Sequence, residues 1–482
     1  MLHQVITHSC YLSLLDTALA KIPLDNLVFH NNDIAIFRML DLDPAIPLLR
    51  QVYSHTGKPA KDPTILFRGL LLASRKCWGP KELVKQLRCH RILRALIGLE
   101  NDDVPGVSTF YDFMKRLVPI FENARIRTPF GRKTKPKNLG ADGKIPDKKP
   151  KQRTTRLTEK ILDDKLSLAA TPERILQLIF KEVAIRPSLA LNLIQPNPVV
   201  SGDGTCLRTG ASSTGRKICE CRKNGQYRCH CKRKFPDPLA NIGWDSQTKS
   251  YYYGYTAFFM TTYSTKHKKD LPLSVRLVDA KRHDSLTALL ALQEFRELYP
   301  EFQMSAFLAD AAMDNYPTYS LLHEWEIPAI IDLNSHTNKR SSIGDITFDQ
   351  KGTPICPAGL PMVYWGKWDQ TFHTRIKFRC PSAAHKSCTC PLNERCNEKP
   401  YGRVFYTHSK EDLRLYPRIP RQSRKFKKLF KQRTATERIN KQVLVDHGLE
   451  TMKLRTKHRN FFYTVMACVD IHLKAQVSVS LA

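Results

Sequence analysis

Two short apolar runs in the 482-residue sequence each lead to an aspartate. Val199 and Val200 come shortly before Asp203, and Ala306 to Ala309 come directly before Asp310. Runs of this length and composition predict short buried strands, so each strand would carry a carboxylate at its C-terminal end. A single aspartate at such a place often does no more than cap the next turn. Because two strands share the design, chemistry becomes the better interpretation.

A third acidic residue lies in a basic segment near the C-terminus. Arg433, Glu437 and Lys441 recur every four residues and therefore project from one face of a predicted helix. A salt-bridged surface stripe would have the same spacing. Two carboxylates can hold one divalent cation, whereas a two-metal nucleolytic site usually requires a third acid. Glu437 is the candidate for that role.

The order of the predicted elements indicates how these acids are positioned. A strand at 199–205 is followed by strands within 251–263 and 271–278, a helix that Asp284 or Ser285 can cap, the Asp310 strand, a helix at 316–325, a strand at 329–331 and a long helix at 421–449. This order predicts an α/β fold with an RNase H-like mixed sheet and flanking helices, in which the ends of the first and fourth strands lie side by side. A generic α/β sheet would alternate strands and helices from the start.

The remaining segments predict a domain organisation. Residues 1–123 predict an all-α DNA-binding domain, with caps at Asp62-Pro63, Gly79-Pro80 and Ser108. Residues 124–163 predict a basic linker, because Arg125 to Lys160 holds 13 Lys or Arg and 3 Asp or Glu; it is either a passive connection or an arm that contacts DNA. Residues 164–482 predict the catalytic domain, with cysteine-rich insertions at about 206–250 and 336–401.

The overall charge restricts the class of partner. Lys and Arg total 77 against 45 Asp and Glu, a formal charge of +32. Such an excess favours a polyanion, and nucleic acid fits better than a membrane because no apolar run is long enough to span one. The N-terminus lacks the layout of a secretion signal. We therefore expect the 14 cysteines to be thiols or metal ligands in a reducing compartment.

Two groups of cysteines are candidate zinc sites. The first group is a CxC-x7-CxC array that consists of Cys219, Cys221, Cys229 and Cys231. The second group lies between the second and third acids, together with His373 and His385. Its cysteines are Cys356, Cys380, Cys388, Cys390 and Cys396. Four thiolates at such spacing can close a tetrahedral zinc site, and free thiols are the alternative for both groups. The second insertion also carries Tyr364, Trp365 and Trp368, which either stack on an unpaired base or pack internally.

The sequence resembles the DDE transposases of bacterial insertion sequences, whose core is RNase H-like. Their third-acid helix carries Tyr-x2-Arg-x3-Glu-x6-Lys, and this chain has Phe430, Arg433, Glu437 and Leu444 at those positions, with Lys441 one turn earlier. The other matches are listed in chain order: Val104 to Phe110, Asp203-Gly204-Thr205, Tyr253-Gly254-Tyr255, Arg282-His283-Asp284 and Asp310 to Asp314. Each motif is short, and their order is what makes the resemblance specific.

The resemblance implies metal-dependent cleavage and strand transfer of DNA. It implies that Asp203, Asp310 and Glu437 bind two Mg²⁺ or Mn²⁺ ions, and that Arg433, Lys441 and Phe430 lie at the DNA. Asp314 is the rival to Asp310 unless it caps the following helix, and His283 is either near the chemistry or structural.

The implied partners are double-stranded transposon ends and target DNA, bound by a homodimer in a synaptic complex in the prokaryotic cytoplasm, at the nucleoid. A non-transposing nuclease or integrase of the same fold is one alternative. A catalytically inactive DNA-binding zinc protein is another.

Overall fold

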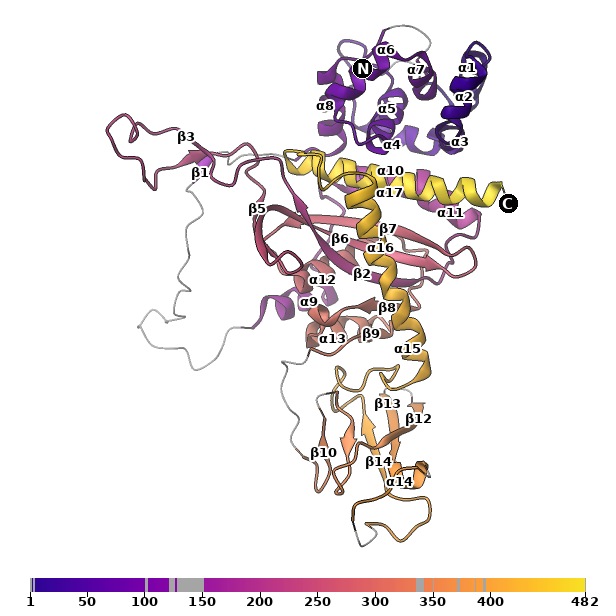
Figure 1. Ribbon diagram of the computed structural model, residues 1–482, viewed down its shortest axis with the longest axis vertical. Coiled ribbons are helices and arrows are strands. Elements are labelled where there is room, and N and C mark those ends of the chain that lie inside the picture. The colour runs from indigo at the N-terminus through magenta and orange to yellow at the C-terminus, as the bar shows by residue number, and fades with distance from the viewer. Residues whose placement is uncertain are drawn as a thin grey trace.

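The computed structural model describes residues 2, 5–99, 103–120, 126–127, 151–334, 342–349, 351–370, 373–385, 387–392 and 396–481. Figure 1 shows a helical domain at one end, a central sheet with helices, and a small second sheet at the other end. A thin hairpin projects sideways from the central sheet. The mixed α/β architecture confirms the predicted fold class.

Helices alone build the N-terminal domain. They are α1 (His8–Leu19), α2 (Leu24–Phe29), α3 (Asn31–Met39), α4 (Ile46–Gln51), α5 (Pro63–Arg75), α6 (Pro80–Cys89), α7 (Arg91–Ile97) and α8 (Val107–Leu117). Asp62 caps α5 by accepting a hydrogen bond from the Thr64 amide at 2.7 Å, and α6 begins after Gly79. The predicted cap at Ser108 is wrong. Gly106 occupies that position and α8 already includes Ser108, because the helix starts one residue earlier.

The central sheet has the strand order of an RNase H-like fold. Its strands are β2 (Val199–Arg208), β5 (Asn241–Asp245), β6 (Ser250–Ser264), β7 (Lys269–Asp279), β8 (Ala306–Ala309) and β9 (Ala329–Ile331). The path is β5-β6-β2-β8-β9, and β7 also pairs with β6. β2 is antiparallel to β6 and parallel to β8, so the two strands that lead to aspartates are neighbours.

Helices cover both faces of this sheet. Successive residues of a strand face opposite sides of the sheet. Ser201 and Gly204 of β2 therefore face opposite sides. The Ser201 hydroxyl contacts Thr436 of α16 (Thr434–Lys441) at 2.6 Å. A Cβ on Gly204 would lie 2.8 Å from Asp284 of α12 (Asp284–Leu298). Thus α16 covers one face of β2 and α12 the other.

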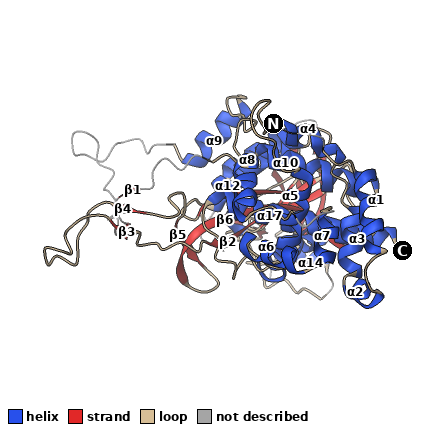
Figure 2. Cartoon of the chain, turned by 90° about the horizontal axis from the view of Figure 1, so that it is seen from above, coloured by secondary structure: helices blue, strands red, loops and turns tan. Residues whose placement is uncertain are grey.

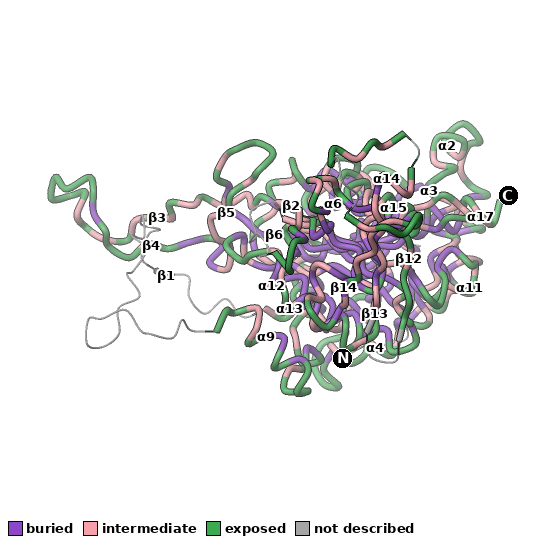
Figure 3. The backbone as a smooth tube through the Cα atoms, turned by 90° about the horizontal axis from the view of Figure 1, so that it is seen from below, coloured by how far each residue is buried: buried purple, intermediate pink, exposed green. Residues whose placement is uncertain are grey.

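The C-terminal helix α17 (Lys457–Ser480) was not predicted from the sequence, and it joins the two main domains. It contacts α3, α5 and α8 of the N-terminal domain as well as β7 of the sheet. Figure 1 shows it lying between them. Most of its residues are buried, and the tube in Figure 3 is mostly purple near the middle of the molecule. Among the described residues, none of the helices combines the length and apolar character needed to cross a membrane.

Two predicted segments differ in detail from the structure. The basic linker 124–163 ends in a helix, α9 (Arg153–Leu162), which packs on α12 and on α13 (Tyr316–Glu324). Thr158 and Ile161 are the buried residues of α9. Residues 124–125 and 128–150 lie outside the described part. The long C-terminal helix is not uniform, because 3-10 and π turns interrupt it: α15 (Arg424–Phe430), η4 (Lys431–Arg433), α16 and η5 (Gln442–Asp446).

The second insertion folds as a small sheet with its own core. Its antiparallel sheet consists of β12 (Val363–Gln370), β13 (His373–Arg379) and β14 (Val404–His408), and β14 lies beyond the predicted boundary at 401. Tyr364 packs against this core, whereas Trp365 and Trp368 are 45% and 69% exposed. Only part of the aromatic set is therefore used for packing.

A buried charge network crosses the interface between α17 and the N-terminal domain. Arg75 of α5 forms ion pairs with Asp33 of α3 and with Asp470 of α17. The Asp470 side chain is fully buried, and Lys474 is a further cationic partner at 2.7 Å. Removing one partner of such a network leaves the others as uncompensated buried charges.

We expect Asp470→Ala to lower the free energy of unfolding by about 3–5 kcal/mol. The matched control is Asp16→Ala, because Asp16 pairs with Arg38 in an exposed setting, and it should cost less than about 1 kcal/mol. Urea unfolding followed by circular dichroism measures both. Equal effects of the two substitutions would contradict the role assigned to Asp470.

Candidate active site

The strand register places Asp203 beside Asp310. β2 and β8 are parallel, and Ser201 is paired with Leu308. Asp203 follows Ser201 by two residues, as Asp310 follows Leu308, so both aspartates continue the same row and point to the same face. Neighbouring strands lie about 4.8 Å apart. The sequence prediction that these two acids lie together therefore agrees with the geometry of the sheet.

A network of hydroxyl groups fixes the position of α16 over this pair. Thr436 contacts the side chains of Ser201 at 2.6 Å and Thr261 at 2.7 Å, and all three residues are buried. One turn further along the helix, the Asn440 amide reaches the Asp203 carboxylate at 3.4 Å. Glu437 lies between these two contacts in sequence, with a half-exposed side chain. The helix thus carries Glu437 along the side of the sheet where Asp203 points.

The residues predicted beside Glu437 have different surroundings. Arg433 donates to Glu437 at 2.6 Å and acts electrostatically on Asp203. Phe430 stacks on Phe426 and packs against a cluster that includes Leu308 of β8, so its ring is largely used for packing. Lys441 is exposed at the end of α16. Of Phe430, Arg433 and Lys441, Arg433 is therefore the residue that interacts with Glu437 and Asp203.

The site holds more negative charge than the protein neutralises. Burial, followed by the carboxylate of Asp310, raises the pKa of Asp203 to about 7, whereas a hydrogen bond from the Gly204 amide and the charge of Arg433 act in the opposite direction. A carboxylate with such neighbours is half protonated near neutral pH unless a cation is present.

A further acid was missed as a site residue. Asp284 is the first residue of α12, and burial raises its pKa, with a smaller opposing effect from His283 and a reinforcing one from Asp310. Its carboxylate lies against Gly204, the residue that follows Asp203. The signal available in the sequence was an acid at the start of the helix that follows the third strand. The predicted cap at Asp284 or Ser285 is wrong: His283 is the N-cap, and its ring nitrogen accepts from the Ser285 amide at 3.3 Å.

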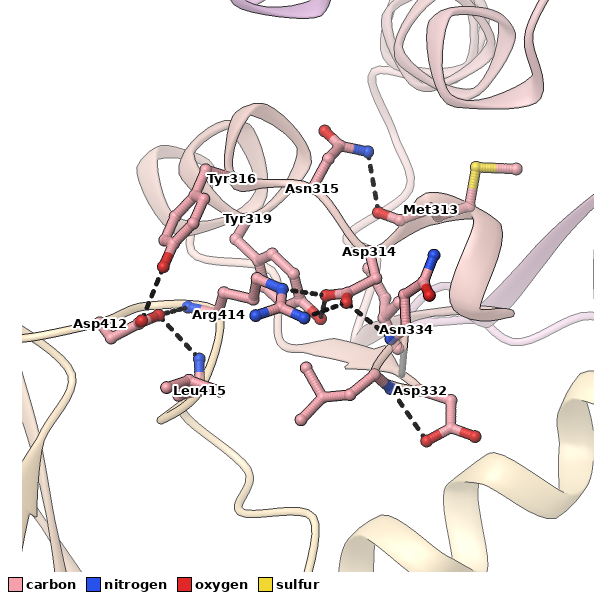
Figure 4. Close-up of polar contacts among 12 residues, drawn as sticks. Met313, Asp314, Asn315, Tyr316, Tyr319, Asp332, Asn334, Asp412, Arg414 and Leu415 are labelled. Carbon is pink, nitrogen blue, oxygen red and sulfur yellow. Dashed lines mark hydrogen bonds and ion pairs between the residues drawn. The ribbon is translucent and has the colours of Figure 1, made fainter. Parts of the chain in front are cut away.

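Asp314, the rival to Asp310, is occupied elsewhere. Figure 4 shows its carboxylate held by the guanidinium of Arg414, with a 2.7 Å bond from Nε, and by the backbone amide of Asn334 at 2.8 Å. The side chain is fully buried in this ion pair. The expectation that Asp314 caps the next helix is also wrong, since the Asn315 side chain caps α13. Asp310 is therefore the acid that remains available beside Asp203.

The donor set fits a hard divalent cation. Carboxylate and amide oxygens are the ligands that Mg²⁺ and Mn²⁺ prefer. Besides the aspartates, the side-chain oxygen of Asn440 is buried without a hydrogen-bond partner. In the described part of the chain, three acidic oxygens do not meet within 4.8 Å of one another.

The two cysteine groups differ. The sulfur atoms of Cys219, Cys221, Cys229 and Cys231 all lie within 4.8 Å of one another. The second group does not assemble such a site: among the described residues, its five cysteines bring no three ligand atoms within that distance. Cys356 is buried in the core of the small sheet with Ile376 and Phe378. This cysteine of the predicted zinc site therefore packs in the core. His373 has a side chain outside the described part.

We expect Asp203→Asn to stabilise the cation-free protein at pH 8 and to have a smaller effect at pH 5. The raised pKa means that the folded state holds a proton on Asp203 that the unfolded chain has lost above about pH 4. The contribution of the Asp203 carboxyl group to the free energy of unfolding is therefore complete below about pH 4. It decreases above that pH and is lost as the pH rises through about 7. Thermal unfolding in EDTA should show a gain of about 1–3 °C at pH 8.

The exposed acid Asp163 provides the control, because its side chain is 53% exposed. Asp163→Asn should leave the melting temperature nearly unchanged at both pH values. A loss of stability in Asp203→Asn at pH 8 would mean that other charges already neutralise the Asp203 carboxylate.

Comparison with known families gives two matches. Residues 23–116, which span α2 to α8, match the model described as "Transposase domain (DUF772)". Residues 195–469 match the model described as "Transposase DDE domain", and this range contains Asp203, Asp284, Asp310 and Glu437. A comparison with curated proteins finds no match. Since the second range covers more than half of the 482 residues, the chain belongs to the family of DDE-domain transposases.

Proposed function

We propose that this protein binds the terminal inverted repeats of its own insertion sequence, cuts the DNA there and joins the ends to a target. The observation that carries the proposal is the position of Asp203 beside Asp310, with the Glu437 helix fixed over the same face by Thr436. Asp310 directly follows β8, whereas Asp203 lies in the middle of β2, just past the pairing with β8 and not at the predicted strand end. The family membership gives the class of reaction.

Each acidic residue has a distinct part in this proposal. Asp203 lies between Asp310 on the neighbouring strand and Asn440 on α16, so it would bridge the two cations. Asp310 would bind one ion and Glu437 the other. Arg433 holds Glu437 at 2.6 Å and would orient it or contact a phosphate. Ionised Asp203 is required, so cation affinity should rise as the pH increases through about 7.

Two Mg²⁺ or Mn²⁺ ions, when bound, would supply the activation of the attacking water or 3′-hydroxyl and the stabilisation of the leaving oxygen. The protein contributes no nucleophile of its own. Its residues Asp203, Asp310 and Glu437 would hold the cations.

The DNA-binding parts follow from the charge and the domain organisation. The N-terminal helices would recognise the ends of the element, and the formal charge of +32 would attract the phosphate backbone. Because two ends must be held together before joining, a homodimer is the proposed assembly. The proposed place of action is the cytoplasm, at the nucleoid.

We expect Asp203→Ala, Asp310→Ala and Glu437→Gln each to reduce divalent-dependent DNA nicking by at least about 100-fold while binding changes less than about threefold. Glu450→Gln is the control, because Glu450 is an exposed acid beyond the same helical segment. Nicking of a supercoiled plasmid that carries the terminal repeats measures the first quantity, and gel mobility shift measures the second. Full activity in Asp310→Ala would remove Asp310 from the site.

Strand joining separates a transposase from a nuclease of the same fold. Pre-cut repeat ends with a free 3′-hydroxyl should be inserted into a target plasmid in Mg²⁺ or Mn²⁺, and Asp203→Ala should abolish the insertion because joining and cutting share one site. Products are counted by sequencing across the junctions. Efficient nicking without any joined product would favour the nuclease interpretation.

A further inference from the structure

The CxC-x7-CxC segment has no part in the proposed chemistry, yet the structure gathers its four sulfur atoms. We define the finger as residues 216–234, which contain β3 (Arg216–Lys217), the four cysteines and β4 (Arg233–Lys234). Figure 1 shows β3, and Figure 2 shows β3 and β4, projecting to one side of the central sheet. In the described part of the chain, the main hydrophobic core takes no residue from the finger. Another interaction must therefore hold it in shape.

The sulfur positions supply that interaction. All four lie within 4.8 Å of one another, and the closest pairs, Cys219–Cys229 and Cys221–Cys231, are 3.6 and 3.5 Å apart. Four thiolates around zinc at about 2.3 Å form a tetrahedron with edges of about 3.8 Å. A disulfide would require about 2.05 Å between sulfurs. The observed separations match a tetrahedral metal and are too long for a disulfide.

The base of the finger is firmly attached to the body of the protein. Asp237 is fully buried just after β4 and accepts hydrogen bonds from Thr209 at 2.7 Å and from the backbone amide of Thr456 at 2.9 Å. The hydroxyl of Tyr255 on β6 also donates to Asp237. These contacts hold the base of the finger against β6 and the start of α17.

The surface of the finger is strongly cationic. It contains eight Lys or Arg and one acid, Glu220, which Lys223 already pairs with at 2.6 Å. Lys217 and Arg233 bond to backbone carbonyl groups within the finger region. The other five cations are exposed, and the described residues offer them no ion-pair partner; they are Arg216, Arg222, Arg228, Lys232 and Lys234. Such a set suits a phosphate backbone.

We propose that Cys219, Cys221, Cys229 and Cys231 bind one zinc ion and that the zinc-ordered finger contacts the phosphates of duplex DNA away from the catalytic acids. This proposal rests on the proposed function for its DNA partner, whereas the zinc site stands on the cysteine geometry alone. Zinc orders the finger, and the ordered finger presents its free cations on a base anchored to the catalytic sheet.

The zinc site is tested by metal analysis of the purified full-length protein. The expected content is about one zinc per chain, falling below one tenth of that value in Cys229→Ser/Cys231→Ser. The control is Cys10→Ser/Cys89→Ser, whose residues are exposed cysteines outside the finger and which should keep the zinc. A wild-type protein without zinc, or with iron instead, would overturn the zinc assignment.

The DNA contact is tested by the salt dependence of binding to a fluorescent duplex of random sequence. Arg222→Ala/Arg228→Ala should reduce the slope of log affinity against log salt by about two units and weaken binding at least about tenfold at low salt. Arg186→Ala, an exposed cation of α11 (Arg186–Ala190), should reduce the slope by less than half a unit. Both arginines of the double variant are exposed, so folding is not at risk.

The outcomes separate the two proposals. An unchanged slope in Arg222→Ala/Arg228→Ala, together with normal strand joining, would overturn the finger contact and leave the proposed function intact. Loss of joining in Asp203→Ala with a reduced slope in the finger variant supports both. A wild-type protein that binds zinc but no duplex would overturn the DNA contact and the proposed function together, while the metal site would stand.

Discussion

The parallel pairing of β2 with β8 is the constraint on which the rest of the site depends. Register brings Asp203 and Asp310 into one row, and the burial of Asp203, followed by the charge of Asp310, raises the pKa of Asp203 to about 7. Two neighbouring carboxylates repel each other unless a cation or a proton intervenes. The fold therefore accepts an unfavourable arrangement at the point where the chemistry needs it.

The small residues around Asp203 show how the neighbouring elements are brought close. A Cβ on Gly202 would lie 2.9 Å from the Phe307 ring, and one on Gly204 would lie 2.8 Å from the Asp284 carboxylate. Ser201 instead uses its hydroxyl to hold α16 through Thr436. Ser201 therefore positions the helix on one face of β2, and Gly204 leaves room for the helix on the other face. Gly202 leaves room for the Phe307 ring, and Asp203 lies between the two glycines.

The outer parts of the molecule are attached to this centre by buried polar contacts as well as apolar packing. α17 links the N-terminal helices to the sheet through the Arg75–Asp470 ion pair, and Asp237 anchors the finger to β6 and to the start of α17. Arg414 and Asp314 join the segment after the small sheet to the region after β8. Contacts of this kind have strict geometric requirements, so they fix the orientation of each part relative to the acids.

The sequence by itself determined the strand-to-acid pattern, the RNase H-like order of elements, the cationic character and the CxC spacing, because these are local properties of composition and periodicity. Tertiary structure alone decided the choice between Asp310 and Asp314, the nearness of Asp284, the separation of the second cysteine group and the position of α17. Each of these depends on contacts between residues far apart in the chain, such as Asp314 with Arg414 one hundred positions later. Local patterns carry no information about such partners, because the cation that pairs with a buried acid can lie anywhere in the chain. Only the fold determines whether that cation reaches the acid.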